Sequence, residues 1–302
     1  MVQYRIFRNV LVLIVVCSRF ALAQEPPPDA LTRQLFEQYA LGGKIDSDSR
    51  LAAIQLIAAR GRYDGFGKHV VTALKSHEPG DGNHRYPEIN CLKILGKMLE
   101  QDSYARMAIE REQETGEIGA IHPVIALGSD VVATLIERGR KADRILVEHY
   151  SIALARARVP ETREFLKSLL PVIVATPAPM PADDLFAPRP QRTNRKQVTE
   201  PIPVSHMPTT QFHAAIGLAL LGETAGTDWL VKNSTATEFN QGDVEHTVPR
   251  GQGNRRSISD CCVVALQQLS GQHLTTKEEW AAWAASVDMK SLRKKRIYLE
   301  DR

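Results

Sequence analysis

Residues 212–233 read FHAAIGLALLGETAGTDWLVKN, and this stretch decides the fold class. Its first half is rich in alanine and leucine and ends at Leu221-Gly222, where a helix typically stops. Its second half is amphipathic, with Trp229 and Leu230 among polar residues. The stretch therefore predicts two helices joined by a short turn, the first narrow enough to lie close between neighbours.

The same pattern recurs along the chain. Small-residue-rich helices are predicted at residues 51–61, 150–158 and 259–271, and amphipathic helices follow the first two. Hydrophobic residues make up 43% of the chain but aromatic residues only 6%, a mix that favours helices over sheets. A single helix pair cannot bury its own apolar surface, so we expect the pairs to stack.

Three segments resemble HEAT repeats: residues 150–169, 218–233 and 260–283. The last is similar to the final repeat and cap of exported bacterial HEAT-like proteins. The resemblance covers most of residues 51–287 and implies an all-α fold, an α-solenoid of stacked helical hairpins with long loop insertions. Equivalent apolar anchors lie 38 to 64 residues apart, against about 40 per HEAT unit, so insertions or unrecognised helices must fill the difference.

The N-terminus predicts export. Two arginines precede an apolar run at residues 9–17, which is shorter than the roughly 20 residues that span a bilayer. Residues 21–23 (ALA) form a small-x-small cleavage pattern. We expect residues 1–23 to be a removed signal peptide and the protein to be periplasmic or secreted. An uncleaved anchor is one alternative; a lipid on Cys17 is another, disfavoured because Val16 stands where a small residue is expected.

Removal of this signal would leave the chain without net charge. Residues 1–23 contain three arginines and no acidic residue, so 35 basic side chains would remain against 35 acidic ones. Nucleic-acid-binding domains usually carry net positive charge, so no nucleic-acid partner is expected. No other segment is apolar enough to cross a membrane, so no integral span is expected after signal removal.

Two insertions interrupt the HEAT-like domain, which we assign to residues 24–289. Residues 171–208 contain nine of the 17 prolines and cannot form a regular helix, and residues 234–257 are polar and rich in glycine. A shorter loop at 77–86 occupies the same kind of position, after the second helix of one pair. Equivalent turns of a solenoid align, so we expect the three loops to gather on one edge.

Loop histidines are the candidate metal ligands. Histidine and carboxylate side chains from converging loops can bind a metal such as zinc. The chain has no HExxH motif, no paired CxxC motif and no calcium-binding loop, so ordinary polar loop residues are the alternative interpretation. The candidates are His77, His84, His206 and His246.

Aromatic and basic residues form the candidate binding surface. Trp280 and Trp283 lie one helical turn apart, where they would cover the end of the stack or offer a platform to a glycan or peptide. Arg255 and Arg256 would add positive charge at the end of the second insertion. Residues 290–302 form a basic tail, expected to be a solvated end or to touch an anionic lipid or cell-wall polymer.

The remaining cysteines, Cys91, Cys261 and Cys262, are odd in number and do not suggest a disulfide framework. We expect buried thiols, with a bridge from Cys91 to one of the other two as the alternative. Neither a GxSxG nor a phosphate-binding glycine motif occurs. The sequence therefore predicts no catalytic residue and no cofactor.

These features predict a non-catalytic binding or scaffolding protein of the cell envelope or exterior, whose partner is another envelope protein. One alternative is a metal-dependent enzyme with its site on the loop edge. Another is a structural envelope protein that binds a cell-wall polymer. The fold alone does not choose among the three.

Overall fold

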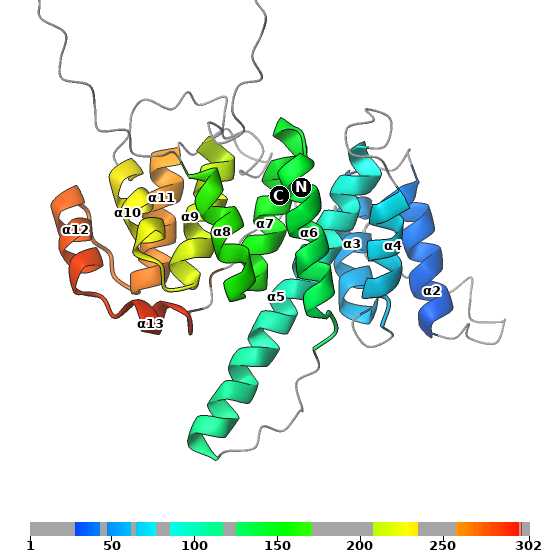
Figure 1. Ribbon diagram of the computed structural model, residues 1–302, viewed down its shortest axis with the longest axis horizontal. Coiled ribbons are helices and arrows are strands. Elements are labelled where there is room, and N and C mark those ends of the chain that lie inside the picture. Colours follow the sequence, from blue (N-terminus) through cyan, green and yellow to red (C-terminus); the bar gives the residue numbers. More distant parts are fainter. Residues whose placement is uncertain are drawn as a thin grey trace, which may run out of the picture.

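The computed structural model describes residues 28–42, 47–61, 65–76, 85–116, 125–170, 208–234, 258–295 and 297. Over these residues the chain forms 12 α-helices, two short helical turns and no strand, which confirms the predicted all-α class. Figure 1 shows the helices standing side by side in a row. The elements are α2 (Pro28–Leu35), η1 (Phe36–Leu41), α3 (Ser47–Gly61), α4 (Gly67–Ser76), α5 (Arg85–Thr115), α6 (Ser129–Lys141), α7 (Arg144–Ala157), η2 (Pro160–Thr162), α8 (Arg163–Leu169), α9 (Pro208–Leu220), α10 (Thr224–Asn233), α11 (Ile258–Ser270), α12 (Lys277–Ser286) and α13 (Met289–Leu292).

Five helices form one layer in chain order, because α3 packs against α5, α5 against α7, α7 against α9 and α9 against α11. Between them, α4 packs on α5, α6 on α7, and both α8 and α10 on α9. Contacts are thus mostly between neighbouring helices. We call the layer of α3, α5, α7, α9 and α11 the first layer. The small-residue-rich helices predicted from the sequence, α3, α7, α9 and α11, belong to it, and the predicted amphipathic helices α4, α8 and α10 pack against it.

The helices α5, α7 and α9 run parallel. Arg85 bonds to Asp143 where α5 and α7 begin, and Arg106 donates to the carbonyl of Ala157 near the far end of α7. Thr209 at the start of α9 donates to Glu148 in the first part of α7. Farther along the same pair, Gly217 lies on Ala155. In each pair, residues early in one helix contact residues early in the other, and later residues contact later ones, which is possible only when the two helices are parallel.

Small residues allow this close packing, as predicted. A Cβ atom added at Gly217 would lie 2.9 Å from the Cα of Ala155 and 2.8 Å from a methyl carbon of Leu166. A Cβ at Gly96 would lie 3.3 Å from the Cα of Ala153. The backbones of α5, α7 and α9 therefore approach one another where a glycine or an alanine stands on each side.

Helix α9 lies at the centre of the molecule, and all of its residues are buried. Ala214 and Leu218 pack into a large cluster formed by the N-terminal helices, whereas Ile216 and Leu220 pack into a second cluster with α10, α11 and α12. A helix that is apolar all round must be enclosed by other elements. Helix α9, which is rich in alanine and leucine, thus joins the two halves of the core.

Helix α5 is 31 residues long, and its far half projects beyond its neighbours (Figure 1). Residues 101–115 are rich in strong helix formers but have few apolar residues. Buried Asp102 fixes the chain that leads into α6, because its carboxylate accepts the backbone N–H groups of Ala126 (2.9 Å) and Leu127 (2.8 Å). Asp102 thus has a structural role, although it lies in the segment 101–115, which has no apolar stripe.

The described part of the basic tail packs against the folded body. Leu292 and Ile297 are buried in the second cluster. Arg293 Nε donates to the carbonyl of Leu221 at 3.0 Å, and Arg158 Nη1 donates to the carbonyl of Lys295 at 2.6 Å. Residues 293–295 therefore link the end of α9 to the C-terminal end of α7; together with Ile297, we refer to them as the C-terminal strap.

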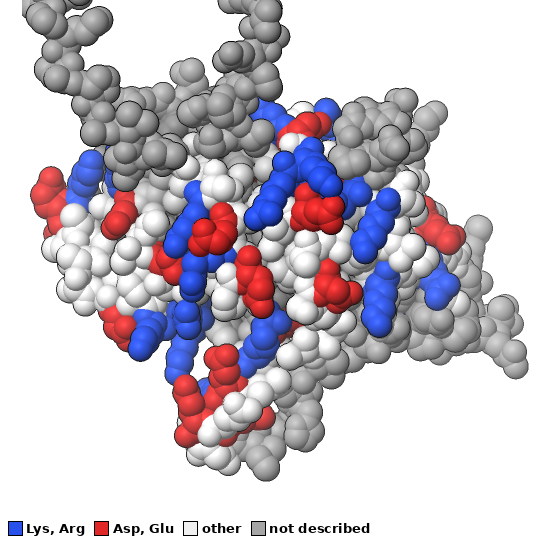
Figure 2. Space-filling model, in the orientation of Figure 1, with Lys and Arg blue, Asp and Glu red and all other residues white. Residues whose placement is uncertain are grey.

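No helix of the described ranges is both long enough and apolar enough to span a membrane. On the side drawn in Figure 2, Lys and Arg side chains are intermixed with Asp and Glu side chains. Lys141 and Glu137 form one such surface pair, at 2.8 Å and one helical turn apart. Ion pairs at this exposure add little stability, so the packed apolar core holds the layers together.

Candidate functional site

The loop residues selected from the sequence lie outside the described residues. This holds for the metal candidates His77, His84, His206 and His246 and for the basic candidates Arg255 and Arg256. The structure does place the residues that flank these loops. They are Ser76 and Arg85, Leu170 and Pro208, and Ser234 and Ile258.

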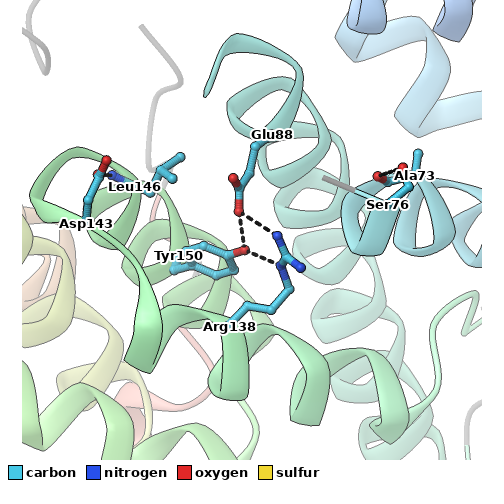
Figure 3. Close-up of polar contacts among 7 residues, drawn as sticks. All are labelled: Ala73, Ser76, Glu88, Arg138, Asp143, Leu146 and Tyr150. Carbon is cyan, nitrogen blue, oxygen red and sulfur yellow. Dashed lines mark hydrogen bonds and ion pairs between the residues drawn. The ribbon is translucent and has the colours of Figure 1, made fainter. Parts of the chain in front are cut away.

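The flank of the first loop is tied to the start of α7. Arg85 Nη2 and Asp143 Oδ2 form an ion pair at 2.7 Å. The other oxygen of Asp143 accepts the backbone N–H groups of Ile145 and Leu146, both at 2.9 Å, and so caps α7 (Figure 3). Partial burial raises the pKa of Asp143, but the two N–H donors and Arg85 outweigh burial and hold this pKa below its usual value.

The flank of the second loop is tied to the same region of α7. Thr209 Oγ1 donates to Glu148 Oε2 at 3.1 Å, and both residues are buried. One turn later, His213 Nδ1 lies 2.9 Å from the carbonyl oxygen of Thr209. Polar side chains rather than apolar ones thus fill the junction between the first part of α7 and the start of α9.

The third loop joins α10 to α11, and its flanks are also in contact: Ser259 Oγ donates to the carbonyl of Ser234. Figure 1 shows the ribbon ending at the upper edge of the molecule at all three loops. We call this edge, formed by the starts of α5, α7, α9 and α11, the helix-start edge. The flanks therefore lie along one edge, while the predicted gathering of the loops concerns residues outside the described ranges and stays a prediction.

A buried polar triad lies just behind this edge (Figure 3). Tyr150 OH donates to Glu88 Oε1 at 2.8 Å, and Arg138 Nη2 donates to the same oxygen at 3.2 Å. Arg138 Nε donates to Tyr150 OH at 3.0 Å. The three residues come from α5, α6 and α7, so the triad fixes these helices relative to one another.

The triad has the electrostatics of a structural network. Burial, together with the nearby Glu88 carboxylate, raises the pKa of Tyr150 above its usual range, so the phenol stays protonated at neutral pH. Burial favours the neutral form of Arg138, but its hydrogen bonds to Tyr150 and Glu88 outweigh burial and raise its pKa. A protonated phenol and a charged guanidinium held by one carboxylate do not make a general base.

No disulfide joins the described cysteines Cys91, Cys261 and Cys262, and Cys91 and Cys262 are fully buried. Burial, helped by the charge of Glu88, raises the pKa of Cys91 to about 12. Burial also raises the pKa of Cys262 above its usual range. The thiolate is the reactive form of cysteine, so neither residue is a nucleophile at neutral pH.

The two tryptophans of α12 differ in exposure. Trp280 is 1% exposed and packs into the second cluster, and Trp283 lies partly buried at the border of that cluster. Their rings meet edge to face, with centroids 6.0 Å apart. Only Trp283 of this pair reaches the surface.

Among the described residues, no group of three or more His, Cys, Asp or Glu side chains is arranged to hold a metal ion. The described surface of the helix-start edge instead carries two large, exposed apolar side chains, Tyr86 at 68% and Ile145 at 44%. They stand on neighbouring helices next to the Arg85–Asp143 pair.

No pattern in the sequence indicates the contacts of the triad directly. Glu88 is an acidic residue within an apolar helical pattern, which is the usual sign of a buried charge with a partner. Its partners lie 50 and 62 residues away, at Arg138 and Tyr150, and only the packing of three helices brings them together.

Comparison of the chain with protein-family models, with curated proteins and with solved structures finds no match in any of the three.

Proposed function

We propose that the protein is a non-catalytic binding protein of the cell envelope or exterior, and that it binds a partner protein at the helix-start edge. We also propose that its paired helices form a HEAT-like solenoid. The predicted signal peptide supports the location. The parallel helices α5, α7 and α9, each followed by a helix that packs against the first layer, support the solenoid.

One observation carries the binding proposal: the flanks of the two predicted insertions and of the shorter predicted loop share the edge on which Tyr86 and Ile145 are exposed. Loops held by a rigid body are where proteins most often place their binding residues. The triad and the Asp143 cap keep the starts of α5 and α7 fixed, so a partner would meet an ordered surface. Such preorganisation lowers the entropy lost on binding.

The experiment compares what variants of the purified, immobilised chain retain from an envelope extract of its source cells. Ile145→Ala alters the helix-start edge, whereas Ile125→Ala is a matched control, because these isoleucines are 44% and 45% exposed. Ile125 precedes α6 and lies next to residues held by Asp102, away from the starts of α5 and α7. A third variant replaces residues 171–207 and 235–257 with short Gly-Ser linkers.

We expect a specific protein to be retained by the unchanged chain and by Ile125→Ala, and to be retained at least about tenfold more weakly by the other two variants. Equal retention by all variants would contradict binding at this edge. Metal bound at near one equivalent, lost when His206 and His246 are replaced, would favour the metal-enzyme alternative. Sedimentation with cell-wall polymer would favour the structural one.

A further inference from the structure

Six basic side chains gather at one corner of the helix-start edge. They stand where α4 and α6 end and where α5 and α7 begin, and only two residues separate the end of α6 from the start of α7. We call this region the basic corner. Its basic residues are Lys75, Arg85, Arg138, Arg140, Lys141 and Arg144.

Two ion pairs join α5, α6 and α7 at the basic corner. Arg85 at the start of α5 pairs at 2.7 Å with Asp143, which caps α7. Arg138 in the last turn of α6 pairs at 3.2 Å with Glu88 in the first turn of α5. These contacts hold the three helix ends next to one another.

Glu137 places the end of α4 beside the same helices. The pKa of Glu137 is lowered by the hydrogen bond from Lys141, at 2.8 Å, and further by the positive charges of Lys75 and Arg138. Between exposed groups in salt solution, a charge acts over no more than about 10 Å. The Lys75 ammonium in the last turn of α4 therefore lies near Glu137 and the end of α6.

The basic corner carries more positive than negative charge. Lys75, Arg140 and Arg144 are exposed, and none of them forms an ion pair with another described residue. Six basic residues against three carboxylates therefore leave an excess of three positive charges. The three pairs are Arg85 with Asp143, Arg138 with Glu88 and Lys141 with Glu137.

The stability of the fold does not account for Arg144. Lys75 and Arg140 stand in the last turns of their helices, where a positive charge is favourable. Arg144 is instead the first residue of α7, where a positive charge is unfavourable, and Asp143 already supplies the cap. Proteins keep such local conflicts mainly at functional sites.

Exposed apolar side chains adjoin these charges. Ile145 follows Arg144 directly, and Tyr86 follows Arg85, which is paired with Asp143. A tyrosine or an aliphatic side chain that a partner covers supplies binding energy, whereas surrounding charges select the partner and orient it. The matching partner presents carboxylates around an apolar centre.

The mixture of charges favours a protein segment over a uniformly anionic surface. Three carboxylates stand among the basic residues of the corner, and they would repel a polyanion that covers the whole region. A protein segment can place its carboxylates opposite Lys75, Arg140 and Arg144 alone. Charge complementarity of this kind selects against partners that carry negative charge everywhere.

We propose that the basic corner binds an acidic segment of the partner protein. This inference rests on the proposed binding function and adds the chemistry of the partner. Carboxylates of the segment pair with Lys75, Arg140 and Arg144, and its apolar side chains cover Ile145 and Tyr86.

The test uses the purified chain and a short fluorescein-labelled peptide of glutamates with two leucines at its centre, with fluorescence anisotropy as the readout. The triple variant Lys75→Glu/Arg140→Glu/Arg144→Glu reverses the excess charge, and the corresponding triple change to Gln only removes it. The matched control is Arg33→Glu/Lys68→Glu/Lys277→Glu, which makes the same charge change at three other exposed basic residues. Circular dichroism and thermal unfolding establish that each variant is folded.

We expect the peptide to bind the unchanged chain and the control with similar affinity. It should bind the Gln variant more weakly and the Glu variant on the order of tenfold more weakly or worse, with differences that shrink at high salt. A second peptide with serine in place of leucine measures the apolar contact. It should bind the unchanged chain more weakly than the first peptide does, whereas Ile145→Ala should hardly distinguish the two peptides.

Three results would overturn the proposal. They are no binding of the glutamate peptide, equal weakening in the control variant, and equal binding of a peptide with lysine in place of glutamate. Sedimentation with phosphatidylglycerol vesicles that depends on Lys75, Arg140 and Arg144, without binding of the peptide, would assign the corner to an anionic surface instead.

The outcome is separable from that of the proposed function. If the Glu triple variant retains the envelope partner as well as the unchanged chain does, the basic corner is excluded while the binding function stands. If no envelope protein is retained but the glutamate peptide binds in a way that depends on Lys75, Arg140 and Arg144, the chemistry of the corner stands and the envelope assignment fails.

Discussion

At the scale of single residues, Glu88 illustrates how one buried carboxylate holds three helices together. Tyr150 and Arg138 both donate to its Oε1, and Arg138 also donates to Tyr150. In a buried network every group depends on its neighbours, because a lost donor leaves an acceptor that water cannot reach. The starts of α5 and α7, where the proposed binding surface lies, are fixed by this network.

Replacement of Tyr150 by Phe should lower the free energy of unfolding by about 1–2 kcal/mol, because it removes one hydrogen bond to Glu88 and one from Arg138. Urea unfolding at neutral pH measures the change. Tyr39→Phe is the control, because Tyr39 is only half-buried at the border of the core, and it should change stability by less than about 0.5 kcal/mol. Equal effects of the two substitutions would show that the triad contributes nothing beyond packing.

The Asp143 cap gives a prediction with a pH dependence. Asp143→Ala removes an N-cap and should cost about 1–2 kcal/mol at neutral pH. The folded-state pKa of Asp143 is lowered, so its contribution is present above its unfolded pKa of about 4 and is lost as pH falls through the folded pKa. The stability gap between the variant and the unchanged chain should therefore narrow below about pH 4.

Asp228→Ala is the control for this measurement, because Asp228 is an exposed residue in the interior of α10. The difference in the free energy of unfolding between the Asp228→Ala variant and the unchanged chain should be the same at every pH. A gap for Asp143→Ala that stays constant from neutral to acidic pH would mean that the carboxylate charge is not what stabilises α7.

At the scale of helices, close approach between α7 and α9 sets the spacing of the first layer. A Cβ at Gly217 would lie within 2.9 Å of Ala155 and Leu166, whereas a Cβ at Gly96 would meet its neighbours at 3.3 Å or more. Real Cβ contacts do not fall below 3.0 Å, so something must move at Gly217. The packing of the first layer therefore depends more on glycine at position 217 than on glycine at position 96.

Gly217→Ala should therefore lower the free energy of unfolding by about 1–2 kcal/mol, because overpacking outweighs the gain in helix propensity. Gly96→Ala should be nearly neutral, since a shift of a few tenths of an ångström relieves its contacts and alanine favours the helix. Chemical denaturation of both variants makes the comparison. A stabilised Gly217→Ala variant would contradict the close approach of α7 and α9.

The sequence predicted helices best where apolar and small residues recur. The helices at α3, α4, α7, α9 and α10 follow such patterns, and capping and turn residues mark their ends. The far half of α5 was not predicted, because residues 101–115 carry helix propensity without an apolar stripe. The burial of Ile297 was not predicted either, because a single apolar residue in a basic tail has no periodicity.

The candidate site could be predicted only in outline. The order of helices and long loops was enough to expect the loop flanks on one edge. The side chains that form that edge were not predictable, because Arg85 and Asp143, or Glu148 and Thr209, are far apart in sequence and meet only through packing. Tyr86 and Ile145 look like ordinary helix residues until their exposure is known.

At the scale of the whole molecule, the C-terminal strap links the C-terminal helices to α7 and α5 in the middle of the helix row. It runs from α13 past the end of α9 to the end of α7, and Lys294 reaches Glu114 on the projecting half of α5 at 2.8 Å. A contact that joins distant parts of the chain makes unfolding more cooperative than stacking of neighbours alone. The strap is thus expected to couple the stability of the two halves.

Ile297→Ala tests this coupling. The side chain is 2% exposed, so truncation should cost about 2–4 kcal/mol. Ile125→Ala removes the same atoms from a 45% exposed position and should cost less than about 0.5 kcal/mol. Hydrogen exchange should show faster exchange in α9 and α13 of the Ile297 variant. Unchanged stability would mean that the strap is not part of the core.

The account as a whole claims that the protein binds a partner at the helix-start edge. Hydrogen exchange of the chain, with and without the protein it retains from envelope extract, tests this claim most directly. The account predicts slower exchange in the first turns of α5, α7 and α9, and no change around residues 125–128. Protection confined to residues 125–128 or to α12, with the starts of α5 and α7 unaffected, would contradict it.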